Sequence, residues 1–98
     1  MVTYTTSTLR IRLPTTLTLE DVNIYCTLEQ GDVEITKDHL EVVDHVITIE
    51  YSQRETAMMH EGKATVMLNF YFSDGRRLPS TKSEIEIKRN VYERVITE

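Results

Sequence analysis

The feature that most constrains the fold is the stretch from Ile47 to Phe72, in which two strand-like patterns flank a short capped turn. Ser52 can accept hydrogen bonds from the free N–H groups of that turn, and Glu55, three residues later, can reach back to the N–H of Ser52. This capping box predicts a short helix over about residues 53–60, ended by Gly62. A helical crossover between two strands is typical of Greek-key sandwiches.

Most of the chain consists of short segments in which apolar and polar residues alternate, the pattern of strands with one buried face. The longest runs from Lys63 to Phe72, and its predicted inward residues are Ala64, Val66, Leu68, Phe70 and Phe72. Shorter segments with strand character lie at 9–13, 22–28, 33–35, 46–51 and 83–88, whereas 40–43 is too short to assign. About seven such strands predict an all-β fold, an immunoglobulin-like antiparallel Greek-key β-sandwich.

The chain length predicts one domain and one core, because 98 residues are too few for two. We place the sandwich at residues 1–89 and treat residues 90–98 as a tail. In the tail, Val91, Val95 and Ile96 fall at helical spacing, but nine residues do not hold a helix in water without packing. The tail is therefore either a docking segment for a neighbouring molecule or a segment that folds back or frays.

Charge and hydropathy exclude several classes of partner. The chain has 11 basic and 16 acidic residues and a net charge of −5, whereas affinity for nucleic acid comes largely from basic groups. No apolar run approaches the roughly 18 residues of a membrane span, and the N-terminus lacks the pattern of a signal peptide. The sequence thus predicts a protein that binds neither nucleic acid nor membrane and is made in the cytoplasm.

The residues that could carry chemistry do not form a recognisable site. His39 and His45 each follow an aspartate, and His60 is the third histidine, but their spacing is not that of a zinc site. Cys26, the single cysteine, lies in an alternating segment and is expected to be a buried small hydrophobe. Ser52 has no glycine elbow and no recognisable histidine partner. We expect no catalytic residue, no metal site and no cofactor, and hence no enzyme.

One surface departs from the clean sandwich pattern. Met67 and Tyr71, which flank Asn69, are predicted to point away from the core, and Tyr25 of an earlier strand is predicted to lie on the same side. Tyrosine and methionine suit partner surfaces, since tyrosine offers a large contact area with a polar tip. These four residues are the candidate partner face. The alternatives are that a loop or the tail covers them, or that scattered exposed apolar groups carry no meaning.

The chain also resembles a known family. The residues that carry the resemblance are Gln53-Arg54-Glu55-Thr56, Gly62, Asp74-Gly75, Ile85 with Ile87, and Asn90 followed by Val95-Ile96. In this order they are similar to small tail-associated proteins of phages and prophages of Gram-positive bacteria, and to the N-terminal immunoglobulin-like domain of phage baseplate upper proteins. Those upper proteins usually continue into a fibre-like or receptor-facing part, which we do not expect within these 98 residues.

The resemblance covers most of the chain and implies a non-enzymatic structural protein or adaptor, associated with a phage tail or baseplate. Its partners would be other virion or prophage proteins, or further copies of the chain itself. It would be made in the bacterial cytoplasm and then enter the virion.

A carbohydrate-binding β-sandwich module that contacts a cell-surface glycan is the competing interpretation. Such modules present aromatic side chains to sugars, and the candidates are Tyr4, Tyr25, Tyr51, Tyr71 and Tyr92. The chain has no tryptophan, and the sequence shows no pairing of aromatic residues on one surface.

Overall fold

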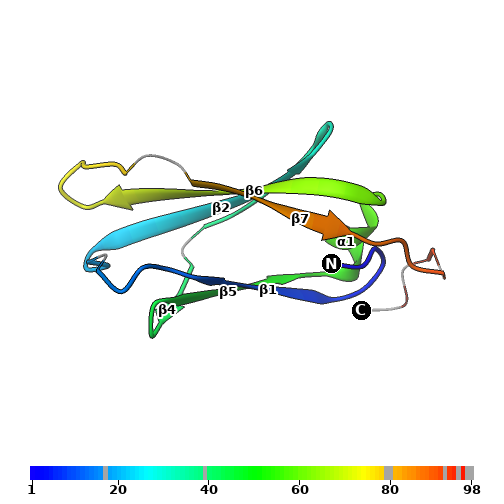
Figure 1. Ribbon diagram of the computed structural model, residues 1–98, viewed down its shortest axis with the longest axis horizontal. Helices are drawn as coiled ribbons and strands as arrows, with labels where there is room; N and C mark the ends of the chain where they lie inside the picture. Colours follow the sequence, from blue (N-terminus) through cyan, green and yellow to red (C-terminus); the bar gives the residue numbers. More distant parts are fainter. Residues whose placement is uncertain (17, 39, 79–80, 92, 95, 97–98) are drawn as a thin grey trace.

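The computed structural model describes residues 1–98 apart from 17, 39, 79–80, 92, 95 and 97–98, and it has two antiparallel sheets. The first sheet has the order β1-β5-β4, with bounds Ser7–Arg12, Val46–Tyr51 and Val42–Val43. The second has the order β3-β2-β6-β7, with bounds Val33–Lys37, Val22–Gln30, Gly62–Phe72 and Thr81–Ile87. Figure 1 shows the sheets as two layers, with α1 (Gln53–Ala57) and the start of the chain at the same end of the molecule. The predicted all-β sandwich is confirmed.

The alternation along the strands determines which side chains fill the space between the sheets. In the register of β2 and β6, Ile24 lies opposite Phe70 and Cys26 opposite Leu68, and all four side chains are buried. Burial of this apolar surface is the main force that holds the layers together. The rest of the buried hydrophobic core consists of Leu13, Leu28, Ile35, Ile47, Ile49, Tyr51, Met59, Ala64, Val66 and Ile87.

The inward pattern of β6 weakens at its end. Phe72, the fifth predicted inward residue, is only half-buried, because the strand ends there and a turn follows. The guanidinium carbon of Arg76, from that turn, lies 4.8 Å from the centre of the Phe72 ring.

The capping box at the crossover is confirmed, but the helix is shorter than predicted. Ser52 and Glu55 exchange the two reciprocal hydrogen bonds, while α1 ends at Ala57 and Gly62 is the first residue of β6. The prediction that Gly62 ends the helix is wrong because a distant residue holds the intervening loop. The side-chain amide of Gln30 donates to the carbonyl oxygen of His60 at 2.8 Å and accepts from the His60 N–H at 2.8 Å.

The segment that the sequence left unassigned contributes the two-residue strand β4, joined to β5 by a tight turn. Asp44 and His45 form this turn, with φ of 52° and 61°. Positive φ at both central residues is the mark of a two-residue hairpin turn, and aspartate tolerates it better than most residues. These two residues therefore shape the backbone here.

The described part of the tail contacts its own domain. The Asn90 N–H donates to the Thr3 hydroxyl oxygen at 3.0 Å, and the Ile96 N–H donates to the Gln53 side-chain oxygen at 2.8 Å. Val91 is fully exposed, while Val95, which belongs to the predicted helical spacing, lies outside the described residues. Within the described ranges, no helix has the length and apolar character needed to cross a membrane.

Candidate functional site

The four residues predicted as a partner face do share one surface. We call Tyr25, Met67, Asn69 and Tyr71 the tyrosine face; they lie on the outer side of the neighbouring strands β2 and β6. Tyr25 is directly opposite Asn69, and Asn23 is opposite Tyr71. Each of the four side chains is half-buried, because neighbours on a four-stranded sheet cover part of one another.

Tyr25 and Tyr71 contact each other across the two strands. Their ring centres are 5.0 Å apart with an angle of 79° between the planes, the edge-to-face arrangement that aromatic pairs favour. The Asn23 side-chain amide donates to the Tyr25 hydroxyl oxygen at 3.2 Å. A guanidinium N–H of Arg77 donates to the Tyr71 hydroxyl oxygen at 2.9 Å, and the guanidinium carbon lies 4.5 Å from the centre of the Tyr71 ring. The two hydroxyl groups are thus held in place before any partner binds.

The turn after β6 brings Arg77 to this position. The Phe72 N–H donates to the Arg76 carbonyl oxygen at 2.9 Å, and the Gly75 N–H donates to the Phe72 carbonyl oxygen at 3.0 Å. Gly75 has φ of 92°, a conformation that side chains disfavour. Asp74 accepts from both the backbone N–H and the side-chain Nε of Arg76, and these hydrogen bonds lower the pKa of the exposed Asp74 carboxyl. The turn closes back on β6, so that Arg77 pairs with Tyr71.

The other end of the tyrosine face is more polar. Met67 lies opposite Thr27 on β2 and opposite Lys82 on β7. The Thr27 hydroxyl is hydrogen-bonded to that of Thr36 at 3.1 Å, and Thr27 is only 8% exposed although it is on the outer side of the sheet. A methionine flanked by threonines and a lysine gives this end an adaptable apolar contact within a polar rim.

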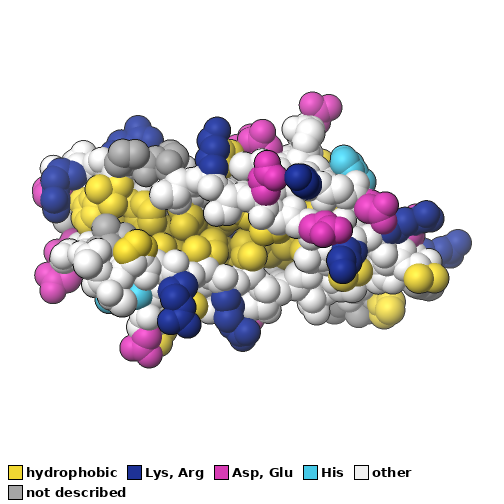
Figure 2. All heavy atoms as spheres, viewed as in Figure 1, with side chains coloured by type: hydrophobic (Ala, Val, Ile, Leu, Met, Phe, Trp, Pro, Cys, Tyr) yellow, Lys and Arg dark blue, Asp and Glu magenta, His cyan; other side chains and the backbone are white. Residues whose placement is uncertain are grey.

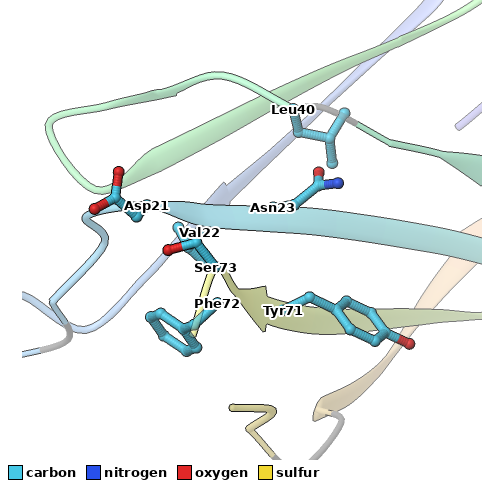
Figure 3. Close-up of a pocket in the computed structure, with 7 residues that line it drawn as sticks. All are labelled: Asp21, Val22, Asn23, Leu40, Tyr71, Phe72 and Ser73. Carbon is cyan, nitrogen blue, oxygen red and sulfur yellow. The ribbon is translucent and has the colours of Figure 1, made fainter. Parts of the chain in front are cut away.

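A shallow hollow of about 520 Å³ adjoins the tyrosine end of this surface. Its lining residues, all shown in Figure 3, are Asp21, Val22, Asn23, Leu40, Tyr71, Phe72 and Ser73. In Figure 3 the Tyr71 ring extends away from Leu40 and Phe72, so the hydroxyl is not directed into the hollow. The lining contains one carboxylate and neither histidine nor cysteine, which suits contact with a partner side chain better than acid–base chemistry.

The buried ionisable groups lie in the core, away from this surface. Burial raises the pKa of the Cys26 thiol, and the Tyr51 hydroxyl lowers it less than burial raises it. Burial also raises the pKa of Tyr51, and the adjacent Cys26 raises it further. Both side chains are at most 2% exposed, and the Tyr51 hydroxyl has no hydrogen-bond partner among the described residues. A protonated, enclosed thiol is a packing group and not a nucleophile.

Glu55 is ionised and held by two partners. Partial burial alone would raise its pKa, but the Lys37 ammonium group and the Ser52 N–H and hydroxyl together hold the pKa below its usual value. The Lys37 Nζ lies 2.6 Å from one carboxylate oxygen, and the Ser52 N–H donates to the other at 2.9 Å. With its carboxylate engaged on both sides, Glu55 stabilises the crossover.

The described residues contain no group of three or more histidine, cysteine, aspartate or glutamate side chains placed to hold a metal ion. His45 lies in the β4–β5 turn and His60 on the loop after α1, while His39 lies outside the described residues.

Sequence reasoning missed Asn23 and Arg77, which fix the two tyrosine hydroxyls. The alternation of β2 could have predicted Asn23 on this surface, since it lies two residues before Tyr25 on the same side. No local pattern could have placed Arg77 there, because its position depends on the turn after Phe72 closing back onto β6.

Comparison with known proteins gives a structural likeness without a family. No family profile matches the chain, and no curated protein is significantly similar to it in sequence. A crystal structure of a proposed glycoside hydrolase from Bacteroides vulgatus is similar in fold, with a TM-score of 0.55 and 10% sequence identity over 91% of this chain. The match spans 16% of that longer chain, and at this identity the likeness concerns the fold alone.

Proposed function

We propose that this chain is a non-enzymatic adaptor that binds other proteins through the tyrosine face. The observation that carries the proposal is the Tyr25–Tyr71 pair, whose hydroxyls are positioned by Asn23 and Arg77 on the outside of a sheet. Positioned aromatic side chains with polar tips lose little conformational freedom on binding, and tyrosine and arginine are enriched among residues that dominate interface energies. One Arg77 N–H contacts Tyr71, which leaves further donors of this exposed side chain for a partner.

The partners we propose are components of a phage or prophage tail or baseplate, including further copies of this chain. This part of the proposal rests on the resemblance to tail-associated proteins and to the baseplate upper-protein domain. The small β-sandwich and the core thiol, which needs no disulfide partner, are compatible with synthesis in the bacterial cytoplasm followed by assembly into a particle.

A carbohydrate-binding module is the second candidate. Two tyrosines beside an asparagine and an arginine on one surface favour it. Against it, sugars stack on open aromatic faces, whereas Arg77 lies over the Tyr71 ring and the two rings are nearly perpendicular. The geometry therefore favours a protein partner.

The decisive variant carries two charges on the tyrosine face, Met67→Glu with Tyr71→Glu, and its matched control is Thr48→Glu on the exposed outer side of β5 in the other sheet. Particles from the strain that encodes the chain are purified and analysed by quantitative mass spectrometry. We expect the wild-type chain and the control at a fixed copy number per particle and the double variant below about a tenth of that number, as for a lost interface anchor. Circular dichroism verifies that each variant is folded. A double variant that is incorporated normally, or a wild-type chain absent from particles, would overturn the proposal.

A glycan array separates the two candidates. Binding to a cell-wall polysaccharide that disappears in Tyr25→Ala or Tyr71→Ala would favour the carbohydrate module, whereas no binding to any glycan on the array would exclude it.

Light scattering over a concentration series, with the full chain and a version that ends at Arg89, tests self-association. An oligomer that dissociates on truncation would mean that the tail docks between copies.

A further inference from the structure

A second surface, separate from the tyrosine face, lies on the open side of the sandwich. Strands β1 and β7 are edge strands of different sheets, and a groove of about 260 Å³ runs between them. Its lining residues are Leu9, Arg10, Ile11, Arg12, Val66, Leu68, Thr81, Ser83 and Ile85. Figure 2 shows hydrophobic side chains gathered in a band along the middle of the molecule, between the two layers of Figure 1. The core is therefore incompletely covered along this side.

The strand order explains why the groove is open. In an immunoglobulin-like sandwich one sheet has the order A-B-E-D and the other contains C, F and G. Here β1, β5 and β4 occupy the positions of B, E and D, and the described residues place no strand at position A beside β1. The groove lies where the inward side chains of strand A would pack.

The start of the chain shows how a strand would enter the groove. Val2 pairs in parallel with Lys88, just after β7, with a hydrogen bond of 2.9 Å from the Thr3 N–H and one of 2.8 Å to the Met1 carbonyl oxygen. A strand that extended the Val2 segment backwards from Met1, into the space beside β1, would run parallel to β7. Figure 1 shows β1 and β7 running in opposite directions. The added strand would therefore be antiparallel to β1, the orientation in which its backbone groups can pair with the free edge.

The rim of the groove carries unbalanced positive charge. Arg10 and Arg12 are exposed on the outer side of β1, opposite Thr48 and Val46 of β5, and within the described ranges neither forms an ion pair. Two neighbouring cations at a strand edge, in a chain of net charge −5, discourage pairing with a basic segment and favour an acidic one.

From these features we infer that the groove accepts one extended segment of another protein as an added strand beside β1. The segment carries apolar side chains at alternate positions, which fill the space between Leu9, Ile11 and Ile85, and acidic side chains at intervening positions next to Arg10 and Arg12. Strand addition of this kind obtains affinity from backbone hydrogen bonds and specificity from alternate side chains. The groove, at about 260 Å³, is smaller than the roughly 300–1,000 Å³ sites of small molecules, and its lining follows the edges of two strands, which fits an extended peptide.

The first experiment joins such a segment to the chain itself. A seven-residue extension that alternates valine with glutamate or threonine is linked to Met1 through two glycines, and the control extension has serine at each valine position. We expect the valine extension to raise the melting temperature by at least about 5 °C over the control, as expected for a strand that adds to the folded state. It should also slow amide exchange in residues 7–12. Equal melting temperatures and equal exchange for the two extensions would overturn the inference.

The second experiment supplies the same seven residues as a free peptide, measured by calorimetry. We expect the double variant Arg10→Glu with Arg12→Glu to bind it at least about fivefold more weakly than wild type, and a lysine version of the peptide to prefer that variant. Arg94→Glu, an exposed tail position, is the control. Equal affinity of wild type and the Arg10→Glu, Arg12→Glu variant for the peptide would contradict the charge assignment. If the chain forms an oligomer that Ile85→Lys disrupts, the occupant of the groove is a second copy of the chain instead. The Met67→Glu, Tyr71→Glu variant should bind the peptide normally, so failure here is distinct from failure of the tyrosine face.

Discussion

The hydroxyl of Thr56 ties the crossover to the start of the chain, and its removal should cost far more than the loss of an exposed hydroxyl. Thr56 is 1% exposed, and its hydroxyl donates to the Thr5 carbonyl oxygen at 2.7 Å while it accepts from the Thr5 N–H at 3.1 Å. Thr56→Val keeps the shape of the side chain and removes both hydrogen bonds to Thr5. Two bonds at roughly 1 kcal/mol each, with part-buried backbone groups left unpaired, give a loss of about 2–3 kcal/mol in the free energy of unfolding.

Urea denaturation and a thermal melt measure this loss directly. For a domain of this size, 1 kcal/mol corresponds to a shift of roughly 4–8 °C, so the melting temperature should fall by about 8–24 °C. The matched control is Thr48→Val, an exposed position in β5 that should stay within about 0.5 kcal/mol of wild type. A Thr56→Val variant as stable as Thr48→Val would refute the reasoning, since it would mean that this contact does not hold the chain start against α1.

Three further perturbations test other parts of the fold. Gln30→Ala leaves the His60 N–H and carbonyl oxygen without their partner and should lower the free energy of unfolding by about 2–3 kcal/mol, measured in urea; a loss under about 0.5 kcal/mol would contradict the role of Gln30. The pKa of Glu55 is lower in the folded protein than its usual value of 4.5, so the stabilisation that its carboxylate provides is present above that pH and is lost as pH falls. Glu55→Gln should therefore flatten the decline in the free energy of unfolding between about pH 5 and 3. Burial raises the pKa of the Cys26 thiol above its usual 9.0, so the stabilisation that the protonated thiol provides is present below that pH and is lost as pH rises. Above about pH 9 wild type should lose stability relative to Cys26→Ala, and the same pH dependence in both proteins would contradict this.

Local patterns predicted the parts of the fold that depend on neighbouring residues. The alternation from Lys63 to Phe72 was enough to place β6, and the Ser52–Glu55 spacing was enough to place the start of α1. The end of the helix was misplaced because Gln30, far away in sequence, holds the backbone of His60. No pattern within the crossover carries that information.

The candidate surfaces show the same division between local and distant contacts. The alternation of their strands predicted that Tyr25 and Tyr71 lie on the same side of the sheet. Their edge-to-face contact, however, depends on the register of β2 against β6. Arg77 reaches Tyr71 only because the preceding turn closes on Phe72. The groove between β1 and β7 follows from the strand order of both sheets, which alternation alone cannot supply.

The most direct test of the adaptor role is site-specific photo-cross-linking. A benzophenone amino acid replaces Met67 on the tyrosine face or, in a second protein, Thr48 on the outer side of the other sheet, and each is irradiated in cells that assemble particles. The adaptor role predicts a covalent adduct with one defined polypeptide from position 67 and none from position 48. Adducts from position 48 alone, or from neither position in cells that release complete particles, would contradict the assignment of the tyrosine face as the contact surface.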